Sequence, residues 1–193
     1  MTVSETDRLH SQLSRLEDQF PGYRMEIVGG NIMMSPVKPF HGRTIRLLEN
    51  ALEAQLGPEW GCMSDVIFRF TDLDELCPDS ALLPMAEVDR NLSVYSPDLI
   101  ELAIEVVSPS SVHHDYVTKD RLYAQRGIAH YLIFDPYRAE CTVHWNPGAD
   151  GYRGRDVIPY GKPVEVTMDI GAVTIETDAL PVDRETRTQP LDR

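Results

Sequence analysis

A glutamate stands deep inside the most apolar stretch of the chain. If residues 99–107 form a strand, its period of two places Glu105 on a face with Ala103 and Val107, while the opposite face is apolar. A carboxylate that is buried without a partner is strongly destabilising or stays protonated. We therefore expect either a cation beside Glu105 or a half-exposed strand at the edge of a sheet.

Four other residues could complete a site around Glu105. Asp115, Lys119 and Tyr123 are spaced i, i+4 and i+8, so a helix would carry them on one face. The simpler interpretation of Asp115 and Lys119 is a surface ion pair worth ~0.2–0.5 kcal/mol. Asp79 follows a proline and precedes a short apolar run, a position that is also common for a turn residue. An Asp, a Glu and a Lys that converge suit a hard divalent cation with an activated water.

The hydrophobic pattern predicts the elements that must position these residues. Apolar residues at helical spacing predict helices over residues 7–19, 41–56 and 114–125. Predicted strands cover residues 23–28, 31–35, 66–70, 80–83, 99–107, 131–134, 141–145, 164–168 and 173–176, with an acidic loop at 71–77. This mixture predicts an α/β (α+β) fold with a mixed central β-sheet flanked by helices. We expect a single domain over residues 1–181 and a polar, disordered tail at 182–193.

Composition limits the classes of function. The 193 residues carry a net charge of −13, and residues 72–105 alone contain nine acids and one base. Such a charge repels nucleic acid at long range, so contacts to phosphates are expected only from a few basic side chains. The best candidates are Lys38, Arg43 and Arg46. The alternative is that these three residues simply form the solvated start of a helix. Three cysteines without metal spacing, no secretion signal and no apolar run of membrane length predict a cytoplasmic protein that does not enter a membrane.

Four stretches of the chain resemble one nuclease family. They are the hairpin at residues 23–36, the helix that begins near His41, the Pro78-Asp79 pair, and the long segment 97–136 that contains Glu105 and Lys119. Their order and identity resemble the PD-(D/E)XK nuclease superfamily and, within it, the Uma-type restriction endonucleases. The resemblance covers most of the chain, about residues 23–145.

The resemblance implies a restriction-endonuclease-like core with Asp79 and Glu105 as ligands of Mg²⁺, for which Mn²⁺ could substitute. The superfamily's lysine normally follows the acid by two residues, where this chain has Val107. The Uma-type pattern places the lysine on the next helix, which makes Lys119 its replacement.

Other residues are expected to assist. Glu26 and His41 match positions of the family and could complete or orient the site, although His41 could equally cap or pack against the start of its helix. Asp115 and Tyr123 are further accessory candidates because they share the helix face of Lys119.

The function implied is Mg²⁺-dependent hydrolysis of phosphodiester bonds in DNA by a homodimer, with an additional protein partner left open. The acidic charge favours an alternative, a catalytically inactive binding or assembly module that retains the nuclease fold.

Overall fold

The computed structural model describes residues 5–17, 19–20, 23–36 and 38–184. Its helical elements are α1 (Glu5–Glu17), α2 (Pro39–Leu56), α3 (Met85–Val88), a 3₁₀ turn (Pro97–Leu99), a π-helical segment (His114–Lys119) and α4 (Asp120–Gln125). Its strands are β1 (Tyr23–Val28), β2 (Asn31–Pro36), β3 (Trp60–Met63), β4 (Ile67–Arg69), β5 (Glu75–Leu76), β6 (Ser80–Pro84), β7 (Val94–Tyr95), β8 (Leu102–Val106), β9 (His130–Asp135), β10 (Glu140–Gly148), β11 (Gly151–Pro159), β12 (Val164–Met168) and β13 (Gly171–Ile175).

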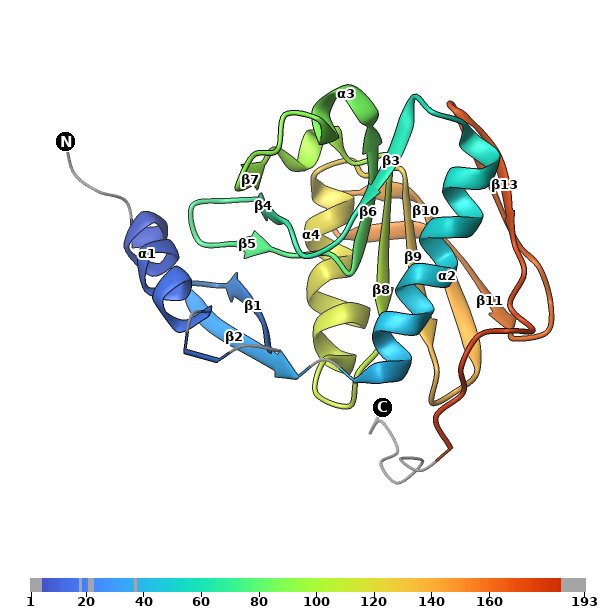
Figure 1. The fold of residues 1–193 in the computed structure, drawn as a ribbon, viewed down its shortest axis with the longest axis horizontal. Helices are drawn as coiled ribbons and strands as arrows, with labels where there is room; N and C mark the ends of the chain where they lie inside the picture. The colour runs from blue at the N-terminus through green and yellow to red at the C-terminus, as the bar shows by residue number, and fades with distance from the viewer. Residues whose placement is uncertain (1–4, 18, 21–22, 37, 185–193) are drawn as a thin grey trace.

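The larger sheet is mixed and lies between helices. Its strand order is β11-β10-β9-β8-β6-β3. β8 and β9 are parallel, joined through the π-helical segment and α4, and β6 pairs with β8 in the antiparallel sense. α2 and α4 cover opposite faces of this sheet (Figure 1). The predicted fold class, a mixed central sheet flanked by helices, is confirmed.

Strand β8 divides the core into two layers. Leu102, Ile104 and Val106 pack in the cluster that includes α2, whereas Ala103 and Val107 pack in the cluster that includes α4. All five side chains are at most 1 % exposed, so this alternation buries apolar surface on both faces. The period-two reading of the strand is confirmed, although the strand begins at Leu102 because a 3₁₀ turn precedes it.

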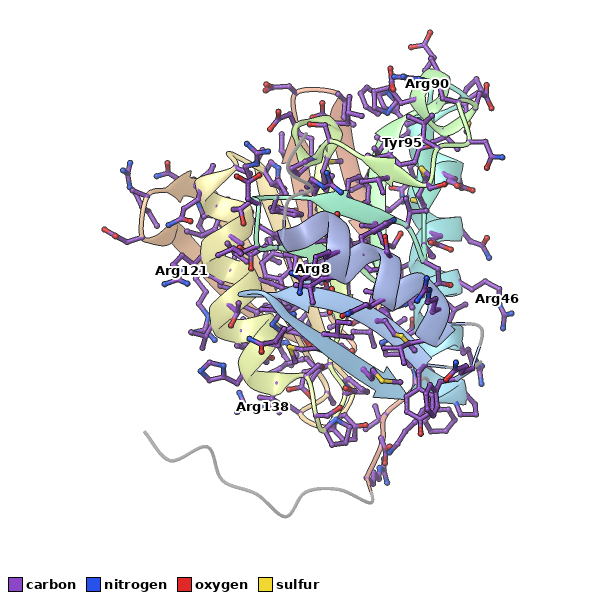
Figure 2. The ribbon with its side chains drawn as sticks, turned by 90° about the vertical axis from the view of Figure 1, so that its left-hand side faces the viewer. Arg8, Arg46, Arg90, Tyr95, Arg121 and Arg138 are labelled. Carbon is purple, nitrogen blue, oxygen red and sulfur yellow. The ribbon has the colours of Figure 1, made fainter. Side chains whose placement is uncertain are left out.

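A second sheet, ordered β2-β1-β5-β4-β7, carries the N-terminal hairpin. The predicted hairpin is confirmed, with Val28 paired to Asn31 and a two-residue turn at Gly29 and Gly30. Both glycines have positive φ, 53° and 74°, which the tight turn requires and which residues with a Cβ adopt less readily. In Figure 2 the hairpin lies in front of the larger sheet, between α4 and α2.

Some elements differ from the sequence pattern. β11 was not expected, because most of its side chains face solvent and give no alternating signal. β10 continues to Gly148, past the strand expected at 141–145, because Pro147 and Gly148 pair with the start of β11. β5 lies inside the predicted acidic loop, where Glu75 is 1 % exposed and accepts a hydrogen bond from Arg69 at 2.7 Å.

The single domain expected over residues 1–181 stays a prediction. Of the tail predicted at 182–193, residues from 185 onward lie outside the described part of the chain. Asp183 is described, and its backbone N–H donates to the Pro136 carbonyl at 2.9 Å. None of the helices in the described residues is long and apolar enough to cross a membrane.

Candidate active site

One cavity of ≈ 30 Å³ brings together residues that are far apart in the sequence. A space of this size can hold a water or a small ion. Among the side chains that line it are six that the sequence singled out: Glu26, His41, Asp79, Glu105, Asp115 and Lys119. Tyr123, the remaining candidate, contacts Glu105 beneath the cavity.

Asp79 lies at the start of β6 and is tied to β8. Its Oδ2 accepts a hydrogen bond from the backbone N–H of Val106 at 2.6 Å and lies 2.9 Å from Nε2 of His41. Its Oδ1 contacts the guanidinium of Arg24. The side chain is 3 % exposed, so Asp79 does more than form a turn. Because Val106 follows Glu105 directly, the hydrogen bond from Val106 holds Asp79 beside the end of the β8 strand.

Glu105 is a central, buried carboxylate with a cationic partner. β8 lies between β6 and β9, so the alternative of an exposed edge strand is wrong. Oε1 of Glu105 accepts from Nζ of Lys119 and from the hydroxyl of Tyr123, both at 2.8 Å. Burial raises the pKa of Glu105, and the charge of Lys119 offsets only part of that rise.

Lys119 connects three carboxylates. Its Nζ lies 2.8 Å from Glu105, 3.0 Å from Glu26 and 3.8 Å from Asp115, and the side chain is 3 % exposed. The alternative of a surface ion pair between Asp115 and Lys119 is therefore wrong. Burial alone would lower the pKa of Lys119, but the three carboxylates outweigh it and raise the pKa. The ammonium stays charged at physiological pH.

The helix that carries these residues was expected to be α-helical throughout, and its first part is instead a π-helix. The wider i→i+5 turn places His114, Asp115 and Lys119 all on the buried side. Asp115 also accepts a hydrogen bond from Ser111 Oγ at 2.5 Å. Burial raises the pKa of Asp115 well above its ordinary value despite the charge of Lys119.

Glu26 reaches the cavity from β1. Its Oε1 accepts from the backbone N–H of Cys77 at 2.8 Å, and Oε2 lies 3.3 Å from Nε2 of His114. Burial would raise the pKa of Glu26, but Lys119 and His114 outweigh it and lower the pKa to about 2. Glu26 is thus a permanent negative charge. His114 was not singled out from the sequence, because an α-helical reading gave no reason to bury it with Asp115.

His41 stands in the first turn of α2, and its partner is Asp79 rather than the backbone of its own helix. Burial, and then the charge of Arg24, lower the pKa of His41 to about 4. The ring is therefore neutral at pH 7. With its proton on Nε2 it can donate to Asp79 without adding a charge to the cavity.

Arg24 is the main residue of the site that sequence reasoning missed. It lies on β1 and contacts Asp79 through Nη1, while Nη2 donates to Asp65 at 3.2 Å. Its Nε is buried without a hydrogen-bond partner. Alternation along β1 was the available signal, because Arg24 and Glu26 are two residues apart and so share a strand face.

The charges of the cavity suit a divalent cation. Four carboxyl side chains line it, against only two permanently charged cations, Arg24 and Lys119. Burial is the main cause of the raised pKa values of Glu105 and Asp115, and a divalent cation beside them would lower both. Among the described residues, no three His, Cys, Asp or Glu side chains form a ready metal cluster. Mg²⁺ commonly uses one or two carboxylates together with water and substrate phosphate, so Asp79 and Glu105 remain a suitable pair.

Comparison with known proteins decides the family. The model of the Uma2 family, described as "Putative restriction endonuclease", matches residues 10–180. The chain belongs to the Uma2 family. The match includes every residue of the cavity named above, so the resemblance seen in the sequence is confirmed. No curated protein matches this Uma2 chain in sequence.

A solved structure supports the fold. It is described as the crystal structure of "a putative nuclease belonging to DUF820" from Anabaena variabilis. Its TM-score with this Uma2 chain is 0.64 at 15 % sequence identity, over 86 % of this chain and 89 % of that one. At this identity the likeness shows a shared restriction-endonuclease-like fold.

Proposed function

We propose that this protein is a metal-dependent DNA endonuclease of the PD-(D/E)XK type. One observation carries the proposal: Asp79, Glu105 and Lys119 line a single small cavity whose four carboxyl side chains outnumber its two permanent cations. Membership of the Uma2 family, whose description is "Putative restriction endonuclease", supports phosphodiester hydrolysis. Mg²⁺ is the cofactor proposed, with Mn²⁺ as a substitute, and Asp79 and Glu105 are its ligands.

The residues of the cavity have distinct roles in the proposed hydrolysis. A bound Mg²⁺ would supply neutralisation of the scissile phosphate and a water of lowered pKa. Lys119, charged and held between Glu26 and Glu105, orients that water or stabilises the charge that develops on the phosphate. Tyr123 and Asp115 act through their contacts, Tyr123 on Glu105 and Asp115 on Lys119, and are positioning residues. Neutral His41 orients Asp79.

The nucleic acid would approach an acidic protein through a few local cations. Lys38, Arg43 and Arg46 are exposed at the start of α2, near the end that carries His41. Figure 2 shows Arg46 pointing outward from α2 and Arg121 outward from α4, on either side of the hairpin. Cleavage of both strands of a duplex calls for two centres, so we propose a homodimer, which sedimentation equilibrium would test.

A catalytically inactive module is the second candidate, and the contact between Arg24 and Asp79 favours it. A guanidinium beside Asp79 satisfies the carboxylate that would otherwise bind metal. In an inactive protein this pair would persist at high metal concentration. In the nuclease proposed here, metal displaces Arg24 from Asp79.

The experiment is a plasmid cleavage assay with the purified full chain in EDTA, Mg²⁺ and Mn²⁺. We expect nicked and linear products only with metal, and their loss in Asp79→Asn, Glu105→Gln and Lys119→Met. Asp98→Asn is the matched control, because this carboxylate is 66 % exposed and lies outside the cavity. Cleavage that survives Glu105→Gln, or that proceeds in EDTA, would contradict the proposal.

A further inference from the structure

A groove with room for a small molecule lies beside β10, β11 and β12, on the side of the larger sheet that packs with α2. Its volume of ≈ 280 Å³ is far larger than the ≈ 30 Å³ of the candidate active site. Small molecules commonly bind in spaces of roughly 300–1,000 Å³, so the groove is at the lower end of that range. His130, the first residue of β9, lines the groove, whereas Glu105 pairs with Ile133 further along that strand. The groove is therefore a separate feature of the molecule.

The floor of the groove is apolar and includes an aromatic ring. Val143, Ile158 and Val166 line it together with the half-buried Trp145. A Cβ on Gly154, which pairs with Trp145 across β10 and β11, would lie 2.2 Å from two atoms of the indole. The ring therefore lies flat on the backbone of this glycine, where a side chain would take its place. Because Trp145 also lines the groove, the other face of the indole is available to a ligand.

The charged side chains that line the groove are both acidic. They are Asp156 on β11 and Glu165 on β12, and both are exposed. Neither carboxylate forms an ion pair or a side-chain hydrogen bond with any residue in the described part of the chain. Arg155 follows Gly154 on the strand and so projects from the opposite face of β11. Burial lowers the pKa of His130, so its ring adds no positive charge at pH 7.

These walls suit an organic cation. Two carboxylates without basic partners would repel a phosphate or another anion. A hydrated metal ion would gain nothing from the apolar floor. An ammonium group is attracted by a carboxylate and by the face of an indole, and a methylene chain buries apolar surface on Val143, Ile158 and Val166. An aliphatic amine with more than one ammonium group combines all of these interactions.

We propose that this groove binds an aliphatic polyamine, with its methylene chain on the apolar floor and its ammonium groups against Trp145, Asp156 and Glu165. The site goes beyond the proposed nuclease function and does not depend on it. The polyamine would supply the positive charge that the protein itself lacks on this surface. The sequence gave no sign of the site, because Trp145 and Glu165 are brought together only by the packing of β12 beside the sheet.

The tryptophan of the groove reports binding directly. The chain has two tryptophans, so Trp60→Phe leaves Trp145 as the only one. Spermidine is titrated into the full chain with this substitution, in EDTA and at constant ionic strength, and the indole fluorescence is followed. We expect a saturable change in fluorescence. 1,4-Butanediol, which has a methylene chain without a charge, should cause no such change.

Removing the two carboxylates of the groove should weaken the binding. Asp156→Asn combined with Glu165→Gln should raise the spermidine concentration at half-saturation by roughly threefold to tenfold, as expected for two exposed ion pairs. The matched control is Asp72→Asn combined with Asp89→Asn, which removes the same charge from two exposed residues outside the groove. This control should leave the half-saturation concentration unchanged within about twofold.

Thermal melting confirms that each variant is folded. A Trp145 signal that does not respond to spermidine overturns the inference, as does equal weakening by the two pairs of substitutions. Tighter binding of a tetralysine peptide than of spermidine also overturns it, because the groove would then belong to a basic segment of a protein partner. Plasmid cleavage with Mg²⁺ tests the nuclease function separately from all of these outcomes.

Discussion

Replacement of Lys119 by methionine tests whether one buried ammonium holds the carboxylates together. The side chain is 3 % exposed and its Nζ is within 3.0 Å of both Glu26 and Glu105. Removing one partner from a buried ion pair is destabilising by ~3–5 kcal/mol. For a chain of this size, that loss corresponds to a fall in melting temperature of roughly 6–20 °C. The unfolding midpoint by circular dichroism in EDTA is the measurement.

The loss of stability caused by Lys119→Met should depend on pH. In the wild type, Glu26 has a folded pKa of about 2, below the unfolded value of 4.5. It therefore contributes stability above pH 4.5 that is lost as pH falls toward 2. Without Lys119, burial dominates and raises the pKa of the buried carboxyl groups above their values in the unfolded chain. Ionising these groups as pH rises then lowers the stability of the folded protein. The deficit of Lys119→Met should thus be larger at pH 8 than at pH 5.

Lys162→Met is the matched control, because Lys162 is exposed and its substitution should change stability by no more than ~0.5 kcal/mol. A Lys119→Met variant that melts with the Lys162→Met control at pH 8 would refute the reasoning. It would mean that the carboxylates of the cavity do not depend on the ammonium.

Three further predictions concern the cavity and its surroundings. Glu105→Gln should leave the metal-free protein at least as stable as wild type, because burial already raises the pKa of Glu105. Mn²⁺ should raise the melting temperature of this variant less than that of wild type. A destabilised variant, together with a wild type whose melting temperature does not respond to metal, would count against Glu105 as a ligand. Arg24→Gln should bind Mn²⁺ more tightly in isothermal titration calorimetry, because the guanidinium no longer competes for Asp79, and unchanged affinity would contradict that competition. Cys62 and Cys77 should react slowly with Ellman's reagent at pH 8 in the folded protein and rapidly in urea. The reason is that burial raises the pKa of both thiols to about 12. Fast reaction of the native protein would contradict this prediction.

The sequence predicted the parts of the site that depend on strand period and helix spacing. Alternation along β8 predicted which face carries Glu105, and the spacing of Asp115, Lys119 and Tyr123 predicted that they converge. Both are local properties of the backbone, so they can be read without knowing the fold. The family resemblance added Asp79 and Glu26, whose isolated positions carry little signal.

What the sequence could not predict depends on partners that are distant along the chain. Arg24 was not singled out, because nothing local along the hairpin shows that Asp79 lies beside it. His114 became buried through a π-helical turn, which composition does not encode in any simple pattern.

Crystals grown with Mn²⁺ test the central claim, that the cavity is a divalent metal centre, most directly. Anomalous scattering locates the ion independently of any activity. We predict one peak within ~2.0–2.6 Å of a carboxylate oxygen from both Asp79 and Glu105, with the guanidinium of Arg24 withdrawn from Asp79. Saturating Mn²⁺ that leaves Arg24 on Asp79, with no peak in the cavity, would contradict the metal-dependent nuclease and support the inactive module.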